Sequence, residues 1–275
     1  QQNIYYYFKE GEQMETITFT REIPVTKQVD VFIAGGGPAG IAAAVTASRM
    51  GARVFLAEKG QCLGGAATLA GVPAFMRFSD GVHFLAGGIG REVFDAMYGP
   101  DTDDTAVEYP VYTEKLKLFY DRLVSESGCE LLFDTQFMDV QADRGRIHCV
   151  ILKGHENLFA VKAHTYIDCT GDGTLAVKAG ARWEKGDSQG RMMPATLCTL
   201  WNGIDWNRAI AELGKDPDAR MLDQAFRDGV FTLPDPSLPG MWKLRGSLGG
   251  GNIGHVFGID GTDEEQLTKG ILDAR

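Results

Sequence analysis

A glycine-rich turn near the start of the chain, followed by a glutamate, has the residue types and spacing that bind a dinucleotide. Residues 35–40 read GGGPAG, and Glu58 follows eighteen residues after the last of these glycines. Gly35 permits a tight turn, Gly37 removes the side chain that would block a pyrophosphate, and Gly40 lets a helix approach a strand closely. The carboxylate of Glu58 would accept hydrogen bonds from both hydroxyls of an adenosine ribose, which argues against NADP at this site.

Two further turns of small residues favour FAD over NAD as the dinucleotide. Residues 64–68 read GGAAT, six residues beyond Glu58, and would let the main chain approach the far end of a longer dinucleotide. Residues 169–173 read CTGDG and follow an apolar segment that predicts an interior strand. NAD would leave both turns without a ligand, so we expect FAD, with an NAD-dependent dehydrogenase as an alternative.

A second dinucleotide-like pattern, GGGNIG at residues 249–254, does not predict a second nucleotide site. No apolar strand precedes it, Gly258 and Gly261 would break a helix after it, and no later strand carries an acid. We interpret it as a loop or a turn between strands. Without an NADPH site, the cofactor would exchange electrons with a molecule that diffuses in.

His255, close in sequence to Asn252 and Arg245, is the candidate acid or base, and Arg245 is the second candidate catalytic residue. Histidine suits proton transfer near neutral pH, although a single histidine is more often a structural hydrogen-bonding group. Cys62, just before the second glycine turn, could have a redox role, but no second cysteine is near it in sequence. The other four histidines are weaker candidates.

The elements that must position these residues form a βαβ unit and a β-meander. Apolar periodicity predicts a strand at 29–34, a helix at 41–50 and a strand at 53–57. A helix at 112–127, with Thr113 as N-cap and Gly128 as its stop, leads to a short buried strand at 130–133. Three antiparallel strands are expected at 136–142, 146–152 and 158–163, followed by a separate interior strand at 165–168 and a helix at 174–179.

The signals are weaker beyond Ala181. A strand is expected at 194–203, helices at 206–213 and 217–227, a rigid proline-rich loop at 234–240, and a closing helix at 262–275 with Thr262 as N-cap. The opening residues 1–13 receive no function.

Composition excludes several classes of protein. The chain has 275 residues and a formal net charge of −10, so nothing in it indicates a nucleic-acid or anionic-membrane partner. Its five cysteines are widely spaced and never form a Cys-x-x-Cys pair, which argues against a disulfide framework or a metal site and favours a reducing compartment. No run of about 18 apolar residues and no leader pattern is found, so we expect a cytoplasmic protein.

In order along the chain, these motifs resemble those of FAD-dependent oxidoreductases with the glutathione-reductase-type flavin fold, especially a bacterial group. The shared pieces include residues 35–40, 58–59, 63–68, 87–89, the meander, 168–173 and 258–263. Cys169 stands where such proteins commonly have alanine. Members usually continue with a segment that closes over the flavin and carries a late Gly-Asp motif, so we expect either a truncated form or one that relies on another polypeptide.

The resemblance implies an α/β fold: a Rossmann-like parallel sheet with a three-stranded β-meander crossover and a partial, substrate-side α+β region. The implied organisation is an extension at 1–28, an FAD-binding domain at 29–180 with a helical insertion at about 70–112, and a substrate-side region at 181–275. The candidate cofactor-binding residues are Gly35, Gly37, Pro38, Ala39, Gly40, Glu58, Lys59, Gly64, Gly65, Ala66, Thr68, Phe137, Thr170, Gly171 and Asp172.

The function that follows is hydride transfer from a small organic substrate to FAD, with a diffusible electron acceptor. A homo-oligomer is compatible with this function. The alternative from another class is a non-catalytic or incomplete flavin-binding subunit that needs a partner chain.

Overall fold

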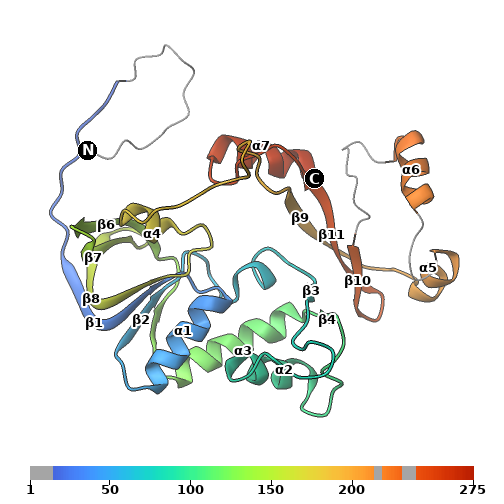
Figure 1. Ribbon diagram of the computed structural model, residues 1–275, viewed down its shortest axis with the longest axis horizontal. Helices are drawn as coiled ribbons and strands as arrows, with labels where there is room; N and C mark the ends of the chain where they lie inside the picture. The colour runs from blue at the N-terminus through green and yellow to red at the C-terminus, as the bar shows by residue number, and fades with distance from the viewer. Residues whose placement is uncertain (1–14, 214–218, 231–239) are drawn as a thin grey trace.

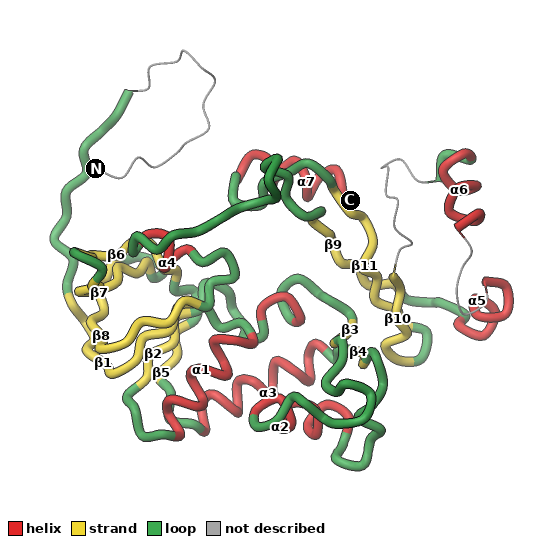
Figure 2. The backbone as a smooth tube through the Cα atoms, viewed as in Figure 1, coloured by secondary structure: helices red, strands yellow, loops and turns green. Residues whose placement is uncertain are grey.

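A six-stranded sheet forms the centre of the first half of the protein. The computed structural model describes residues 15–213, 219–230 and 240–275 (Figures 1 and 2). The strands are β1 (Val25–Ala34), β2 (Val54–Ala57), β5 (Glu130–Leu132), β6 (Gln136–Asp143), β7 (Arg146–Lys153) and β8 (Leu158–Asp168). Their order is β5-β2-β1-β8-β7-β6, with the first four parallel and the last two antiparallel. The predicted Rossmann-like sheet with a β-meander is therefore confirmed.

Strand β8 joins two elements that the sequence predicts as separate strands. It pairs antiparallel with β7 through Leu158–Val161 and parallel with β1 from Ala160 to Asp168. The prediction of a break near His164 is wrong, because the paired backbone continues through that residue. Strand β1 likewise begins at Val25 rather than Val29, since its first residues also pair with β8.

Both faces of the sheet are buried, which explains the nearly continuous apolar sequences of β1 and β2. On one face, Ile33 and Leu56 pack under helices α1 (Pro38–Arg49) and α3 (Thr113–Glu126). On the other, Phe32 and Phe55 pack against meander residues and against Leu175 of α4 (Thr174–Lys178). Figure 1 shows the long helices on one side of the sheet. Strands β1 and β2 are therefore covered by a hydrophobic cluster on each face.

Three local predictions need correction. The N-cap of α3 is Tyr112, with Thr113 as the first helical residue, whereas Gly128 follows the helix end with a φ of 83° as expected. The short strand β5 is at the edge of the sheet, so Glu130 and Leu132 are exposed rather than buried. At α7 (Glu264–Ala274) the cap is Asp263, whose carboxylate accepts a hydrogen bond from the Gln266 N–H at 2.8 Å, because Thr262 lies one residue too early.

An insertion between β2 and α3 forms a small aromatic core. It contains the 3₁₀ turn Gly65–Ala67, the short strands β3 (Ala74–Phe75) and β4 (Tyr109–Pro110), and helix α2 (Ile89–Tyr98). Phe78, Phe94 and Tyr109 are buried together, with ring centroids 5.1 to 5.7 Å apart. This packing gives the insertion its own hydrophobic cluster.

The second half carries a three-stranded antiparallel sheet. Its order is β10-β11-β9, from β9 (Ala195–Trp201), β10 (Gly240–Arg245) and β11 (Leu248–Val256). Helices α5 (Trp206–Leu213), α6 (Ala219–Arg227) and α7 complete the region, close to the predicted ranges. The predicted loop at 234–240 lies outside the described residues except for Gly240, which is the first residue of β10 rather than part of a loop. The pattern at 249–254 is neither a loop nor a turn but the interior of β11, and no nucleotide-binding helix follows it.

Glycine at 250 allows the second sheet to contact the first half of the chain. A Cβ at Gly250 would lie 2.4 Å from the Pro73 Cβ, far inside van der Waals contact. We expect Gly250→Ala to reduce the free energy of unfolding by about 1–3 kcal/mol, as overpacking typically does, in a denaturant titration. Gly261→Ala, where an added Cβ meets nothing within 4 Å, is the matched control. Equal stability of both variants would contradict this contact.

The described helices include none with both the length and the apolar character needed to cross a membrane.

Candidate functional site

The three glycines of the first turn have different surroundings. A Cβ at Gly35, whose φ is 98°, would lie 2.3 Å from the Cys169 carbonyl oxygen, and one at Gly40 would lie 1.9 Å from the Gly35 carbonyl oxygen. A Cβ at Gly37 would meet nothing within 4 Å. Gly35 and Gly40 are therefore required by the protein's own packing. Gly37 instead keeps a space open at the N-terminus of α1, where it is the N-cap residue.

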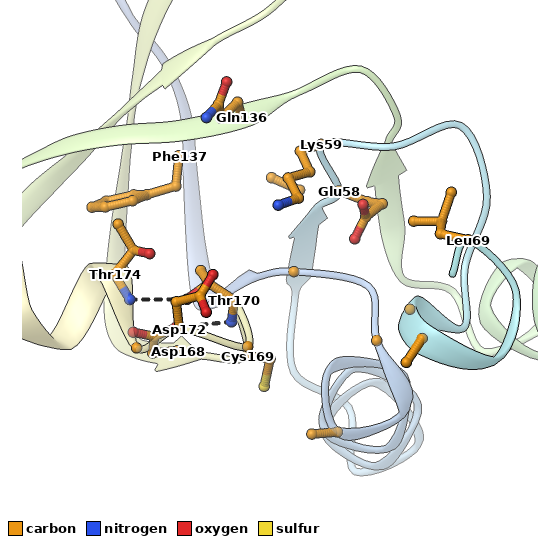
Figure 3. Close-up of a pocket in the computed structure, with 18 of the residues that line it drawn as sticks. Glu58, Lys59, Leu69, Gln136, Phe137, Asp168, Cys169, Thr170, Asp172 and Thr174 are labelled. Atoms are coloured by element: carbon orange, nitrogen blue, oxygen red, sulfur yellow. Dashed lines mark hydrogen bonds between the residues drawn. The ribbon is translucent and has the colours of Figure 1, made fainter. Parts of the chain in front are cut away.

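This space belongs to a crevice of about 690 Å³ above the carboxyl ends of β1, β2 and β8 (Figure 3). Most of the candidate cofactor-binding residues line it: Gly35, Gly37, Pro38, Ala39, Glu58, Lys59, Gly65, Ala66, Phe137, Thr170, Gly171 and Asp172. Its volume lies in the range of ligand pockets. The topology therefore brings together side chains from four separate parts of the sequence.

Three candidates lie behind the crevice wall instead. Gly40 is buried between α1 and β1. The Gly64 N–H donates to the Gly36 carbonyl at 2.9 Å, and the buried Thr68 hydroxyl donates to the Leu63 carbonyl at 2.7 Å. Gly64 and Thr68 therefore shape the second glycine turn without lining the crevice.

Glu58 is buried, with 5% of its surface exposed, and its carboxylate is directed at the first turn rather than at bulk solvent. Its Oε2 accepts a hydrogen bond from the Gly36 N–H and its Oε1 one from the Gly60 N–H, each at 2.6 Å. A carboxylate has about four acceptor positions, so each oxygen can still accept a hydroxyl. Glu58 can thus hold the two loops together and bind a sugar at the same time.

The opposite wall is the turn after β8, which is held by its own side chains. Asp168 Oδ1 accepts from the Thr170 N–H at 2.9 Å, and Asp168 Oδ2 accepts from the Ala176 N–H at 2.8 Å. The Thr170 hydroxyl accepts from the Thr174 N–H at 2.9 Å (Figure 3). These bonds fix the turn itself, and the Cys169 N–H, which donates to the Ala34 carbonyl at 2.8 Å, holds it against β1, where the sequence predicts it.

Sequence reasoning missed several residues of the crevice. Asp168 and Thr174 were recognisable from the polar turn that follows an apolar strand. Thr135 and Gln136 join from the start of β6, and Leu69 and Ala70 from the second glycine turn. No local pattern distinguishes these four, because their position depends on tertiary contacts.

The crevice contains few positive charges. Lys59 is the sole Lys or Arg side chain among the described lining residues, which also include the carboxylates of Glu58, Asp168 and Asp172. A diphosphate would therefore be bound chiefly by main-chain N–H groups and the positive end of α1. Burial raises the pKa of the Cys169 thiol, so this lining side chain stays neutral at physiological pH.

The candidate catalytic residues lie on the second sheet and do not line the crevice. His255 is paired with Thr196 near one end of β11, whereas Arg245 is paired with Leu248 at the other end. His255 is seven positions along β11 from Leu248, which corresponds to roughly 20 Å of strand. The structure therefore does not bring Arg245 and His255 together, as their nearness in sequence had suggested. Cys62 is half-buried and not in a disulfide.

The fold and the site define a dinucleotide-binding protein. It has a Rossmann-like sheet, a glycine turn in which only Gly37 leaves open space, and an acid at the end of the next strand. Residues 30–249 match the model of the FAD dependent oxidoreductase family. The chain belongs to this family, and its cofactor is FAD. The open cradle and the main-chain donors fit the diphosphate of that cofactor.

Several solved structures resemble the chain at low identity. THI4 of Thermovibrio ammonificans is 18% identical with a TM-score of 0.42, over 55% of this chain and 61% of that one. A geranylgeranyl bacteriochlorophyll reductase-like protein of Thermoplasma acidophilum is 18% identical with a TM-score of 0.43, over 57% and 43%. The flavin-dependent monooxygenase PieE, solved with FAD and substrate, is 15% identical with a TM-score of 0.48, over 91% and 47%.

The chain therefore spans less than two thirds of the length of each of these solved structures. No curated protein matches it.

Proposed function

We propose that the protein binds FAD in the crevice and transfers a hydride from a small organic substrate to the flavin, which then passes electrons to a diffusible acceptor. The observation that carries this proposal is the open space at Gly37 beside two glycines that are packed against main chain. Bound FAD supplies the hydride acceptor. The protein's own residues bind the cofactor, orient the substrate and move a proton.

Each part of the crevice has its own binding role in this proposal. Glu58 accepts the hydroxyls of the adenosine ribose, and main-chain N–H groups at the start of α1 bind the diphosphate. Residues 65–70 lie along the flavin side. The Thr170–Asp172 turn flanks the diphosphate and the ribityl chain, and Lys59 supplies the nearby positive charge.

We assign proton removal from the substrate to His255. The register of β11 with β9 places it on the same sheet face as Thr196. That face is turned toward the FAD-binding half, because Gly250 on the same face lies against Pro73. Arg245, at the far end of the hairpin and exposed, would act at most on a distant part of the substrate. The proposed organisation is an FAD-binding domain up to about residue 180 and a substrate-side region after it.

A second candidate function is an incomplete flavin-binding subunit that needs a partner chain. Large apolar side chains on the second half are exposed, with Leu200 at 65% and Ile210 at 53% of their surface. Such exposure is compatible with coverage by further polypeptide. No catalysis by the isolated chain is required in this case.

Anaerobic reduction of the purified protein by a panel of small alcohols, amines and hydroxy acids tests the proposed function. A yellow protein that releases FAD on denaturation and is bleached by one class of donor supports it. Bound flavin that no donor reduces, but that is reduced after addition of a neighbouring gene's product, favours the incomplete subunit. A colourless protein that releases no flavin overturns the assignment of the crevice.

Glu58→Gln should weaken FAD binding and also destabilise the protein without FAD. The glutamine amide would place N–H groups opposite a main-chain N–H donor, which leaves a buried donor without an acceptor. We expect a loss of about 1–3 kcal/mol in the free energy of unfolding and a comparable further loss in FAD binding, measured by denaturant titration and by FAD titration. Glu126→Gln, at an exposed site on α3, is the control. Normal stability of Glu58→Gln would contradict the bonds to Gly36 and Gly60.

A further inference from the structure

One face of the second sheet carries a set of neutral polar side chains that the proposed function does not use. Cys198 of β9 is directly opposite Asn252 of β11, and Thr196 is two residues from Cys198. Directly opposite residues of antiparallel strands share a face, with Cβ atoms about 5 Å apart. Thr196, Cys198 and Asn252 are half-buried, and they share this face with His255.

This face is turned toward the FAD-binding half at three points. A Cβ at Gly71 would lie 4.0 Å from the Cys198 Cβ, and one at Gly250 would lie 2.4 Å from the Pro73 Cβ. Trp242, opposite Gly250 in the register, donates its indole N–H to Glu108 Oε2 at 2.5 Å. Gly71 directly follows Leu69 and Ala70, which line the flavin side of the crevice. The polar set is therefore next to that end of the crevice.

The chemistry of the set is specific. The threonine hydroxyl, the thiol and the carboxamide are uncharged, and burial raises the pKa of the Cys198 thiol, which keeps it protonated. The charged side chains of β10 are not part of this set. Lys243 is opposite Gly249, which is next to Gly250 in β11, so Lys243 lies on the other face of the sheet. Arg245 is opposite Leu248, at the far end of the hairpin from Asn252. Leu200 and Trp242 supply apolar surface on the same face.

We propose that Thr196, Cys198 and Asn252 form the substrate-recognition surface, and that the substrate is an uncharged small molecule with a hydroxyl or carbonyl oxygen and an apolar body. This inference rests on the proposed function and names its substrate class. The Asn252 carboxamide binds the substrate oxygen, and the thiol and hydroxyl line the side of the site. Among the described residues of this sheet, the lysine or arginine nearest along this face is Arg245, opposite Leu248 at the far end of the hairpin, so a carboxylate or phosphate ester would find no cation directly beside Asn252.

Thiol modification tests the position of this face without any substrate. The purified protein is treated with N-phenylmaleimide, with and without FAD at about 100 times its Kd, and each cysteine is followed by peptide mass spectrometry. At this concentration about 1% of the protein is free of FAD. We expect both Cys169, in the crevice, and Cys198, on the sheet face, to react at least about tenfold more slowly with FAD. Buried Cys149 serves as the unreactive reference.

The two thiols test two claims separately: that FAD binds in the crevice, and that the sheet face lies next to it. Protection of both supports the inference. If FAD protects Cys169 but not Cys198, FAD is in the crevice but the sheet face is not next to it, and the inference is overturned. An unprotected Cys169 overturns the placement of FAD, and the inference that depends on it fails too.

Substitution of Asn252 tests recognition itself, using the donor that bleaches the wild-type flavin. We expect Asn252→Ala to lower kcat/KM about tenfold through KM, as loss of a neutral hydrogen bond does, with FAD content unchanged. Asn252→Asp should discriminate further against donors that carry a carboxylate. Asn157→Ala, in the exposed loop between β7 and β8, is the control. Wild-type kcat/KM for Asn252→Ala, or preference of the wild type for anionic donors, would overturn the inference.

Discussion

Gly37→Val is expected to abolish FAD binding while the protein remains folded. The valine side chain would occupy the open space at the N-terminus of α1, where an added Cβ meets no atom within 4 Å apart from residue 37 and its chain neighbours. The backbone at Gly37 has φ −69° and ψ 179°, which valine adopts readily. The added atoms would displace a diphosphate from its main-chain donors, so we expect FAD affinity to fall by at least about a thousandfold.

The measurement combines an FAD titration with thermal unfolding of the protein without FAD. Stability should change by no more than about 1 kcal/mol, the range for a changed helix N-cap. Ala42→Val, on the same helix but away from the lining residues, controls for a β-branched residue in α1. Undiminished FAD affinity of Gly37→Val would show that the diphosphate lies elsewhere.

Gly40→Ala is expected to have the opposite pattern, with its largest effect on folding. Its Cβ would lie 1.9 Å from the Gly35 carbonyl oxygen, and both groups belong to main chain that cannot rotate away. Helix α1 would have to move away from β1, which disturbs the packing of Ile41 and Ala44 in the core. We expect the free energy of unfolding to fall by about 3 kcal/mol or more, which is large for a single methyl group.

Denaturant unfolding without FAD measures this effect directly, and Thr46→Ala on the exposed side of α1 is the control. Because FAD binds only the folded protein, excess FAD should recover part of the lost stability in Gly40→Ala but none in Gly37→Val. A Gly40→Ala variant as stable as the control would mean that helix and strand are not in close contact.

The sequence allowed prediction of those parts of the fold and site that depend on local pattern. The turn at 35–40, the acid at 58 and the turn at 169–173 each combine glycine with a neighbouring strand or helix, and the structure brings all three to one crevice. Local rules failed where pairing decides the conformation. Strand β8 continues through His164 because β1 pairs with it on that side, and the glycines of β11 are extended because two neighbouring strands hold them.

Residues that depend on tertiary contact were out of reach for the same reason. Gln136 begins a strand like many others. It reaches the crevice because the residues just before it, Asp134 and Thr135, donate their N–H groups to the Gly60 and Glu58 carbonyls. The separation of Arg245 from His255 follows from the hairpin register, whereas their closeness in sequence suggested a shared site.

The scarcity of cationic side chains around the crevice has a practical consequence for handling the protein. A cofactor held mainly by main-chain dipoles displaces few bound counterions, so its retention should depend only weakly on ionic strength. Chromatography in concentrated sodium chloride should therefore leave the protein yellow, whereas the exposed ion pairs on its surface would be screened.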